Sequence, residues 1–494
     1  MTQEPPAPGG SLAQLMEERR RKCAQLTAAG TRCWGVDFEP DHSCLEASRL
    51  APAEPGVRGP EVAVAGRLLR LRPSGKITFA DLFDATGRLQ LLASADGAHP
   101  ELVGQLAEHD LGDIVGARGS LTRTRRGEPS LEITDLVLLA KALRPPAGKH
   151  RGVVDTELRY RRRYLDLLST PEHQTAFRQR SAVVRALRRT LDDRGFLEVE
   201  TPVLQPIPGG GEARPFLTHH NALDTDLYLR IALELHLKRL LVGGLERVYE
   251  LGRVFRNEGL SPRHNPEFTL LEAYQAYGNL SSMMDLCEAL VAGAASAAEE
   301  AGPVPASTAQ LRPPFRREPM ARLVAERLGV DPLQLWERPE ELAQRAREAG
   351  ATGPLPATAG ELLFAVYEEL VEPSLASPIF VTDYPVEVSP LARRSPDPRF
   401  CERFELVVQG RELANAFSEL NDPLEQRRRL EEQARRRERG NLEVPPFDED
   451  FVEALEHGMP PAGGIGVGVD RLVMLLVGAP SVRDVLLFPT LRPE

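Results

Sequence analysis

The sequence predicts an α+β protein in which a small N-terminal β-barrel precedes a larger domain of alternating strands and helices. Residues 61–145 contain five short β-like runs, several of them separated by turn signals such as Ser74-Gly75 and Arg126-Gly127. From about residue 174 the spacing of apolar residues becomes helical, and strands and helices then alternate to the C-terminus. Five short strands within about 80 residues favour a closed barrel, and the oligonucleotide-binding barrel is the commonest type with that strand count.

The composition is that of a globular protein. Hydrophobic residues make up 42% of the 494 residues and charged residues 27%, and the 40 Gly and 42 Pro residues are too few for a fibrous or disordered chain. The longest apolar stretches fall short of the roughly 18 residues that a membrane span needs. The polar N-terminus lacks the apolar stretch of a secretory signal, so we expect a cytoplasmic protein. A net charge of −11 argues against nucleic-acid binding through bulk electrostatics, although a local contact remains allowed.

The first 60 residues predict a helical extension and a linker. A helix is expected over residues 11–30, with Ser11 as its N-cap and Gly30 as its stop signal. The Pro-rich stretch 51–59 is typical of a linker.

The five cysteines contain no C-x-x-C pair, and they predict free or structural thiols in a reducing compartment. Cys33, His42 and Cys44 leave a zinc site open as the alternative, although their spacing matches no standard site.

Residues 142–150 close the barrel unit, and the basic stretch 159–164 follows them. That stretch is either a solvated hinge or a hinge that contacts phosphates. A helix ending at Gly195 is then expected, with Phe177, Val184, Leu187 and Leu191 on one face; a strand is expected over residues 196–204. Residues 303–360 are rich in Pro, Ala and Glu and contain no chemical motif.

The common nucleotide-binding loops are missing from the sequence. No segment matches the Walker A pattern, because Ser74-Gly75-Lys76-Ile77 lacks both the upstream glycine and the hydroxyl residue. The glycines at 464, 466 and 468 resemble a dinucleotide-binding loop, but only 23 residues follow Arg471, too few for a βαβ unit. Any ATP site must therefore use another architecture.

A first candidate segment is a hairpin built from residues 247–259 and 267–274. Period-2 alternation predicts that its strands present side chains able to hold a phosphate, stack on a base and bind a cation, with Phe268, Glu272 and Tyr274 on one face and Arg256 and Glu258 sharing a face of the opposing strand. Arg263 and His264 in the connecting loop suit the outer phosphates of a nucleotide. The alternative is a surface hairpin with ordinary ion pairs.

A second candidate segment covers residues 404–421. A turn at Gln409-Gly410 would bring Glu405 and Glu412 together, and two neighbouring carboxylates persist best with a hard divalent cation between them. Beyond the turn, alternation puts the side chains of three more residues on one strand face: Asn415, Phe417 and Glu419. The alternative is an amphipathic hairpin.

A third candidate segment is the glycine-rich stretch 463–472. Glycines allow a ligand to lie against the backbone. Arg471 would sit in the first turn of the next helix, where cations are electrostatically unfavourable, and a bound anion would explain it. The alternative is a glycine-rich turn with a solvated arginine.

These three segments resemble motif 2, the strand pair before motif 3, and motif 3 of the class II aminoacyl-tRNA synthetases. Motif 2 would cover about 247–277 and motif 3 about 463–476, while about 178–204 resembles motif 1, which builds the dimer interface in that family. The closer similarity is to class II lysyl-tRNA synthetases of the bacterial type. The strings that carry it include ALELHLKRLLVGG, RHNPEFTLLEAY, ELANAFSELNDPLEQR, RDVLLFPTLRP and, in the barrel, RLLRLRPSGKITFADLF.

The resemblance covers about residues 60–494 and implies a domain organisation. Residues 1–60 would be the helical extension and linker, 61–145 an anticodon-binding domain with the oligonucleotide-binding fold, and 146–494 a catalytic domain with an antiparallel sheet flanked by helices. It also implies ATP, L-lysine and tRNA(Lys) as substrates, Mg²⁺ as cofactor, a homodimer, and no association with membranes.

The resemblance further implies an ATP site formed by Arg256, Glu258, His264, Asn265, Phe268, Glu405, Glu412 and Arg471. Arg256 and Arg471 would be the catalytic residues on the α-phosphate, and Glu405 and Glu412 would bind Mg²⁺. The lysine pocket would consist of Gly210, Glu234, Arg256, Glu272, Tyr274, Asn415, Phe417 and Glu419. Independent chemistry supports carboxylates there, because an unpaired buried ammonium is very costly.

In the barrel, Phe79 would stack on an anticodon base, and Arg72, Gln90 and Glu128 would contact the flanking base edges. The spacing of Phe79 leaves open whether it is instead a core residue of the barrel.

The sequence departs from the family pattern at three places. Glu212 follows three glycines where the family has Gly-Gly-Ala, which predicts a more flexible lid; His236 replaces a tyrosine; and Ala416 replaces a glycine, which predicts a narrower pocket floor. The favoured function is lysine–tRNA ligation. Two alternatives are an enzyme that lysylates a protein and a non-catalytic tRNA-binding relative.

Overall fold

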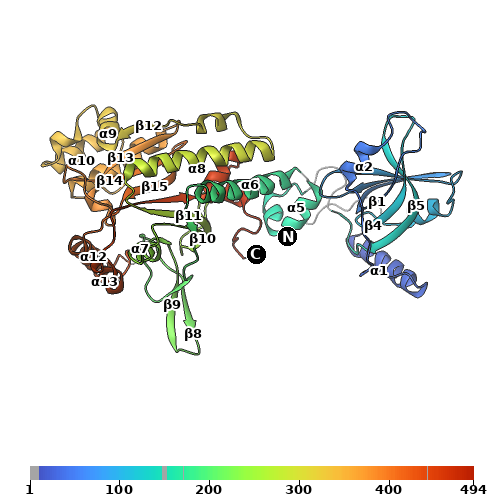
Figure 1. The fold of residues 1–494 in the computed structure, drawn as a ribbon, viewed down its shortest axis with the longest axis horizontal. Helices are drawn as coiled ribbons and strands as arrows, with labels where there is room; N and C mark the ends of the chain where they lie inside the picture. Colours follow the sequence, from blue (N-terminus) through green and yellow to red (C-terminus); the bar gives the residue numbers. More distant parts are fainter. Residues whose placement is uncertain (1–10, 147–152, 171, 442, 494) are drawn as a thin grey trace. The chain divides into compact units, whose positions relative to one another are not determined.

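The computed structural model describes residues 11–146, 153–170, 172–441 and 443–493. The expected end of the barrel unit at 147–150 lies outside these residues. The chain forms two compact units, one made of residues 1–155 with 164–170, and the other of residues 156–163 with 171–494 (Figure 1). In the part of the chain that the structure describes, no helix combines the length and apolar character needed to cross a membrane.

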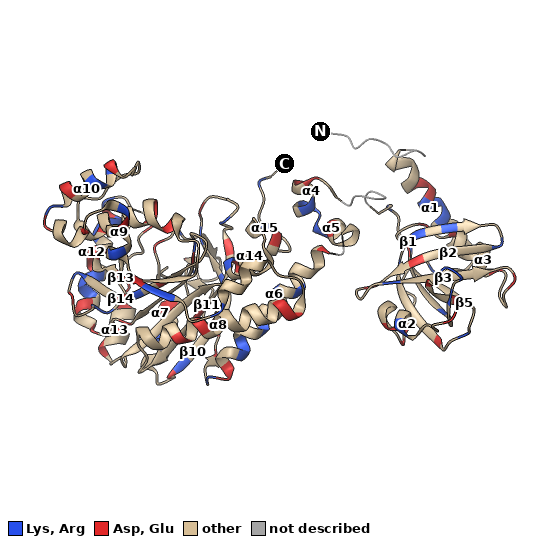
Figure 2. Ribbon diagram, turned by 90° about the horizontal axis from the view of Figure 1, so that it is seen from above, with Lys and Arg blue, Asp and Glu red and all other residues tan. Residues whose placement is uncertain are grey.

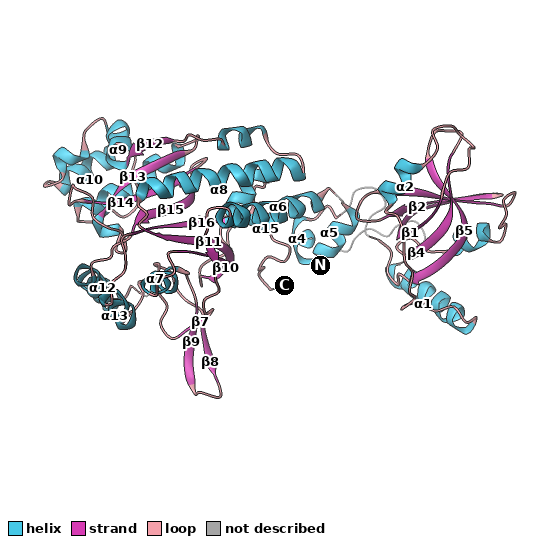
Figure 3. Cartoon of the chain, in the orientation of Figure 1, coloured by secondary structure: helices cyan, strands magenta, loops and turns pink. Residues whose placement is uncertain are grey.

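The first unit contains the predicted five-stranded barrel, whose strands are drawn in magenta in Figure 3. The barrel closes in the order β1-β2-β3-β5-β4. Its interior is filled by apolar side chains such as Val64, Leu91 and Leu131, each fully buried. A helix that the sequence did not predict, α3, connects β3 to β4. The bounds are β1 Glu61–Ser74, β2 Ile77–Phe83, β3 Arg88–Ser94, α3 Leu102–Glu108, β4 Ile114–Arg123 and β5 Pro129–Ala140.

The N-terminal extension packs against this barrel. Helix α1 (Leu12–Ala28) starts at Ser11, whose hydroxyl accepts a hydrogen bond from the Gln14 amide, so the predicted N-cap is confirmed. A second, unpredicted helix, α2 (Cys44–Leu50), contributes Cys44 to the barrel core. The stretch 51–59 is tied to the barrel as well, because the amides of Gly56 and Gly59 donate to carbonyls of β4.

All five cysteines are buried free thiols. Across residues 11–146, 153–170, 172–441 and 443–493, no group of three or more His, Cys, Asp or Glu side chains is arranged to hold a metal ion.

The second unit is built on an eight-stranded sheet in the order β12-β13-β14-β15-β16-β11-β10-β6. Only the edge strands β12 and β6 pair in parallel, so the predicted antiparallel sheet is confirmed. The strands are β6 Leu197–Glu198, β10 Arg247–Phe255, β11 Glu267–Ala276, β12 Arg316–Pro319, β13 Ile379–Pro385, β14 Phe400–Val407, β15 Glu412–Ser418 and β16 Ala462–Gly468. A separate small sheet has the order β7-β9-β8, with β7 Leu204–Gln205, β8 Leu217–His220 and β9 Thr225–Leu229.

Long helices cover one face of the large sheet. They are α6 (His173–Asp192), α8 (Leu280–Ala301) and α14 (Val469–Val477), and their apolar sides form one core with β14, β15 and β16. On α6 the buried row is Val183, Leu187 and Leu191, whereas the predicted Val184 is only partly buried. The charged residues of α6 are five arginines and, at its last position, Asp192 (Figure 2).

The strand predicted over residues 196–204 is interrupted. Only β6 and β7 form at its two ends, because Pro202 has no amide hydrogen for a ladder. In the basic stretch before α6, Arg163 matches neither predicted alternative, since its side chain is neither solvated nor placed to contact a phosphate. That side chain is 1% exposed and donates hydrogen bonds to the carbonyls of Arg483 and Leu486.

The segment between α8 and β14, together with the last helices, completes the unit. Residues from 320 onward form a helical insertion with its own core, in which Val324, Leu342 and Leu363 are fully buried. The remaining elements of this unit are α4 Thr156–Arg161, α7 Glu234–Val242, η1 Ala306–Leu311, α9 Met320–Leu328, η2 Pro332–Leu335, α10 Pro339–Glu348, α11 Ala359–Val366, η3 Tyr367–Val371, η4 Glu372–Ser374, η5 Val386–Val388, α12 Pro423–Glu438, α13 Glu449–Glu456 and α15 Val482–Val485. Helix α5 (Arg163–Ser169) belongs, apart from Arg163, to the first unit.

The close approach of β4 and β5 at Gly119 predicts a stability effect. A Cβ there would lie 2.0 Å from the backbone carbonyl oxygen of Glu132, whereas a Cβ at Gly104 in α3 would meet nothing within 4 Å. We expect Gly119→Ala to destabilise the barrel by about 1–3 kcal/mol, because backbone must move. Gly104→Ala, the matched control, should be neutral or stabilising, because alanine is the better helix former. Calorimetric melting of the full chain measures both, and equal melting temperatures would contradict this prediction.

Candidate active site

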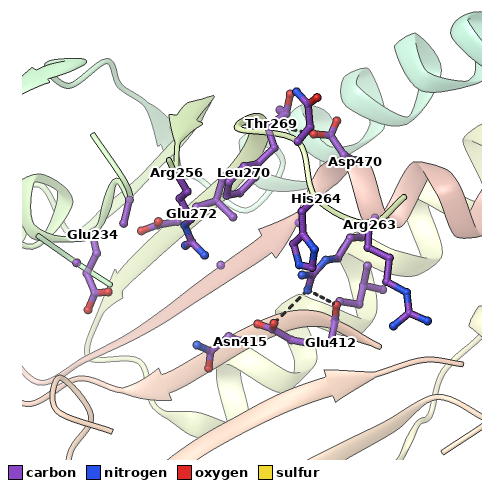
Figure 4. A pocket seen from close by; sticks show the side chains of 18 of the residues that line it. Glu234, Arg256, Arg263, His264, Thr269, Leu270, Glu272, Glu412, Asn415 and Asp470 are labelled. Carbon is purple, nitrogen blue, oxygen red and sulfur yellow. Dashed lines mark hydrogen bonds and ion pairs between the residues drawn. The ribbon is translucent and has the colours of Figure 1, made fainter. Parts of the chain in front are cut away.

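One cavity of the second unit gathers residues from distant parts of the sequence. Figure 4 shows Glu234 at one end, Arg263 and His264 at the other, and Arg256 and Glu272 between them. Of the predicted site residues, thirteen line it: Gly210, Glu234, Arg256, Glu258, His264, Asn265, Phe268, Glu272, Tyr274, Glu412, Asn415, Phe417 and Arg471. Glu405 and Glu419 are buried and are not among the lining residues.

The glycine-rich strand β16 forms the floor of the cavity. It pairs with β11 on one side and β15 on the other, so that Gly466 lies between Glu272 and Asn415, and Gly464 lies between Tyr274 and Phe417. Side chains from the two flanking strands therefore face one another across positions that have none. The third candidate segment is thus a strand that leaves space, followed directly by α14.

Arg256 lies one residue past the end of β10 and continues the hairpin, since its amide donates to the Pro266 carbonyl at 2.8 Å. The prediction that Arg256 and Glu258 share a strand face is wrong, because the chain turns there and the Glu258 amide bonds to the Arg256 carbonyl. Both side chains still line the cavity. The guanidinium of Arg256 lies 5.2 Å from the centre of the Phe268 ring. Burial lowers the pKa of Arg256, opposed mainly by the charges of Glu258 and Glu412.

Arg471 occupies the first turn of α14, as the sequence predicted. Its guanidinium donates to the backbone carbonyl of Glu412 at 2.9 Å and to the carboxylate of Glu412 at 3.1 Å. The anion that accompanies this helix-start arginine is therefore a side chain of the protein itself.

Glu405 and Glu412 stand on either side of the predicted turn. Gln409 and Gly410 both have positive φ, at 52° and 65°, as a two-residue hairpin loop of this kind requires. Glu405 accepts a hydrogen bond from Arg403 at 2.6 Å, while Glu412 pairs with Arg471. Burial and the charge of Glu412 raise the pKa of Glu405, opposed by Arg403. Two close carboxylates of this kind suit a divalent cation, provided that phosphate and water oxygens supply the other ligands.

Acidic side chains surround the opposite end of the cavity. Glu272 is buried and accepts hydrogen bonds from the Leu233 amide at 3.0 Å and from the Tyr274 hydroxyl at 2.8 Å. Burial and the charge of Glu234 raise the pKa of Glu272 to about 7. Glu234 begins α7, and Glu419, directly after β15, is 1% exposed.

Sequence reasoning missed Lys238, which lies among these carboxylates. Its ammonium is 2.6 Å from Glu234 Oε1 and 2.5 Å from Glu419 Oε2, and the side chain is 0% exposed. The i, i+4 spacing of Glu234 and Lys238 on a predicted helix was the available signal, but it does not reveal Glu419.

Two predicted ATP-site residues also make contacts within the protein. The Asn265 side chain donates to the Glu267 carbonyl and accepts from the Thr490 amide, so it links the motif 2 loop to the C-terminal segment. His264 shares a hydrogen bond with the Ser261 hydroxyl, and burial and the charge of Arg471 lower its pKa.

The structure shows what the three residues that depart from the family pattern contact. Glu212 accepts hydrogen bonds from Gln433 and Arg436 of α12, so the glycine segment is anchored, not loosened. Ala416 is fully buried in the core on the opposite sheet face from Asn415 and Phe417, so the predicted narrowing of the pocket floor is wrong. His236 lies 3.3 Å from the Gln205 amide nitrogen.

In the first unit, three of the predicted anticodon residues, Arg72, Phe79 and Gln90, lie on the neighbouring strands β1, β2 and β3, and Glu128 lies directly before β5. Phe79 is half-buried beside two inward-facing residues, Thr78 and Ala80, and it is not part of the barrel core, which resolves the alternative in favour of an outer-face position. Arg72 pairs with Phe79 across the ladder.

The residues around Phe79 are held by polar contacts. Asp81 is buried and ion-paired with Arg72 at 2.8 Å and Arg88 at 3.3 Å. Gln90 accepts a hydrogen bond from Ser130, and Glu128 pairs with Arg88.

Two family models match the chain. The model described as tRNA synthetases class II (D, K and N) matches residues 155–492, and the model of the OB-fold nucleic acid binding domain matches residues 62–139. The chain belongs to the class II tRNA synthetases.

Relatives of high sequence identity have a more specific name than the family, lysine–tRNA ligase. A lysine–tRNA ligase of Moorella thermoacetica is 52% identical over 486 residues, which cover 97% of this chain and 98% of the relative. Lysine–tRNA ligases of Syntrophomonas wolfei and Bacillus subtilis are each 48% identical over 98% and 97% of this chain and 98% of their own lengths.

The floor of the cavity predicts which glycine tolerates a side chain. A Cβ at Gly464 would lie 2.0 Å from Glu419 Oε1 and 2.5 Å from the Tyr274 ring, whereas a Cβ at Gly466 would meet its nearest neighbour at 3.8 Å. We expect Gly464→Ala to cost about 1–3 kcal/mol of stability, because these buried side chains must move. Gly466→Ala, two residues along the same strand, serves as the control. Thermal melting of both variants measures the difference. A melting temperature of Gly464→Ala equal to that of the parental protein would contradict the prediction, because it would show that Glu419 and Tyr274 can move aside at no cost.

Proposed function

We propose that the chain is a lysine–tRNA ligase, which activates L-lysine with ATP to lysyl adenylate and transfers the lysyl group to the 3′ end of tRNA(Lys). The observation that carries the proposal is a cavity with buried carboxylates at one end and Arg256 between its two ends, and with Arg471 among its lining residues. The names of the relatives support the same reaction.

The arginine end of the cavity suits ATP. Arg256 and Arg471 would bind the α-phosphate, and Phe268, beneath the Arg256 guanidinium, would stack under the adenine ring. Glu258 would accept a hydrogen bond from the adenine amino group, and His264 and Asn265 would lie beside the nucleotide. ATP binding would replace the Arg471–Glu412 pair with a phosphate contact.

Glu405 and Glu412 would hold Mg²⁺, with phosphate and water oxygens as its other ligands. Burial and, after it, the repulsion from Glu412 raise the pKa of Glu405. The repulsion supports this role, because a cation between the carboxylates would relieve it. The ion would neutralise phosphate charge when bound.

The acidic end suits lysine. Glu234, Glu272 and Glu419 would surround the ammonium groups, with Tyr274, Asn415 and Phe417 completing the walls and Gly210 covering the pocket. Arg256, which lies between the two ends in Figure 4, would bind the lysine carboxylate beside the α-phosphate.

These residues would act by positioning and electrostatics. A carboxylate oxygen of lysine attacks the α-phosphorus in line, the bond from the α-phosphorus to the bridging oxygen breaks, and pyrophosphate leaves. A terminal adenosine hydroxyl of the tRNA then attacks the lysyl carbonyl carbon, and AMP leaves. No side-chain nucleophile is required, since both arginines are placed where negative charge accumulates.

We further propose a homodimeric assembly and a cytoplasmic location. Large apolar side chains near the motif 1 segment are exposed, among them Leu197 at 52%, Leu204 at 46% and Leu217 at 61%. Exposed apolar surface of this kind favours a homodimer interface. We place the enzyme in the cytoplasm, where tRNA charging takes place.

The first test is ATP–pyrophosphate exchange with each amino acid offered separately. We expect exchange to depend on lysine. Replacing Glu272 by glutamine should raise the KM for lysine by about tenfold to a hundredfold, because a buried charge-assisted hydrogen bond contributes about 1.5–3 kcal/mol. Glu267→Gln on the other face of β11 is the matched control and should leave that KM unchanged. Exchange driven by aspartate or asparagine would refute the assigned substrate.

The barrel predicts a separable effect on tRNA. Phe79→Ala should weaken tRNA(Lys) charging by about 1–3 kcal/mol, the usual contribution of one base–aromatic stack. Lysine-dependent pyrophosphate exchange, which needs no tRNA, should stay at the parental rate. If the enzyme instead transfers lysine to a protein when tRNA is absent, and Phe79→Ala leaves that transfer unchanged, the result would support protein lysylation.

A further inference from the structure

Lys238 is an ammonium group that the reaction described above does not use. It lies in the second turn of α7, is fully buried, and contacts Glu234 of the same helix and Glu419 from the end of β15. Its Nζ also lies 5.3 Å from the centre of the Phe417 ring, a wall of the cavity. A side chain from outside the cavity wall thus reaches the group of carboxylates proposed to bind lysine.

The charges at this end of the cavity do not balance without a ligand. Three buried carboxylates, Glu234, Glu272 and Glu419, lie at this end, and the ammonium of Lys238 contacts two of them, Glu234 and Glu419. With all three carboxylates ionised, this one internal ammonium leaves two negative charges without a counter-charge. Free lysine carries two ammonium groups, while its carboxylate has Arg256 as a partner. The two negative charges left over in the pocket therefore match in number, and oppose in sign, the two ammonium charges of the proposed substrate.

Glu419 is left partly unsatisfied in the described structure. Its Oε1 is buried and has no hydrogen-bond donor among the described residues, although its Oε2 is ion-paired with Lys238. A buried carboxylate oxygen without a donor is costly and points to a ligand that donates there. This oxygen lies next to Gly464 in the cavity floor, where a Cβ would be only 2.0 Å away from it. Because Gly464 has no side chain, the space beside the oxygen stays open.

We propose that Lys238 is a positioning residue for lysine recognition: its ammonium holds Glu234 and Glu419 in place and ionised, so that the pocket presents a net charge of −2 to the incoming amino acid. This inference rests on the proposed function. A buried ion pair contributes little net stability compared with apolar side chains of the same size, so stability alone does not account for it.

The surrounding charges set the direction of a pH effect. Burial raises the pKa of Glu419; Lys238 opposes this, and Glu234 and Glu272 reinforce it. Burial alone would lower the pKa of Lys238, but the charges of Glu234 and Glu419 outweigh it and raise it, so the ammonium stays protonated. Tyr274 also faces these carboxylates, and its pKa is raised by burial and by their charges, so it remains neutral.

Removing the Lys238 charge should therefore shift lysine binding to higher pH. In Lys238→Met, the pocket carboxylates repel one another without a counter-charge, and protonation relieves the repulsion. We expect the KM for lysine in pyrophosphate exchange to rise at least tenfold at neutral pH and to recover as the pH increases from about 6 to about 8, the range above the usual carboxylate pKa values. The KM for ATP should change less than twofold.

Matched variants separate this role from loss of folding. Arg239→Met removes the neighbouring cation of α7, which pairs with Asp448 and Asp450 away from the cavity, and should leave the KM for lysine and its pH profile unchanged. Lys238→Arg retains the charge and should retain the parental pH profile. If Lys238→Met is insoluble, Lys238→Met combined with Glu419→Gln removes one charge of each sign and should restore folding while the KM for lysine stays raised.

The outcomes are distinguishable. A parental enzyme without lysine-dependent exchange would overturn the proposed function itself. With that exchange intact, an unchanged KM and pH profile in Lys238→Met would overturn the role of Lys238, as would equal increases in the KM values for lysine and ATP.

Discussion

The site depends on the pairing of β16 between β11 and β15. A strand with glycine at alternate positions is placed where both neighbouring strands carry large side chains on the same face. Had these positions carried side chains, Glu272, Tyr274, Asn415 and Phe417 would have closed over an ordinary sheet surface. The missing side chains create a cavity whose floor is backbone, inside a sheet whose other face is packed against α6, α8 and α14. Because the packed core fixes the position of the floor and the glycines leave room above it, a substrate can be held there in one position.

The second constraint is electrostatic. The cavity separates charge along its length, with buried carboxylates at one end and guanidinium groups toward the other (Figure 4). Charges taken out of water are costly unless they are paired, so each of these groups needs a partner even before a substrate arrives. The protein supplies several such partners itself: Arg471 pairs with Glu412, Arg403 with Glu405, and Lys238 with Glu234 and Glu419.

These internal pairs connect stability with recognition. The Arg471–Glu412 pair is partly exposed, so a phosphate can displace it at small cost. The Lys238 pairs are fully buried and are expected to persist when lysine binds. In the proposed function the two ends of the cavity thus differ in kind: ATP would exchange with a protein contact at one end, whereas lysine would add to one at the other. The Glu212 contacts with α12 extend the same principle to the lid, because they anchor a glycine segment that has little stiffness of its own.

Local patterns in the sequence by themselves determined the two-part architecture, the five barrel strands and the face shared by Phe268, Glu272 and Tyr274, because alternation and turn chemistry act over a few residues. The Gln409-Gly410 turn could likewise be predicted from the sequence, since a two-residue turn needs positive φ and glycine adopts it readily. Only the tertiary structure decided that Ala416 faces the core, that Phe79 lies outside the barrel core, that the chain bends at Glu258, and that Lys238 reaches Glu419. Each of these depends on which segments, distant in sequence, come to lie against one another, and no local pattern contains that information.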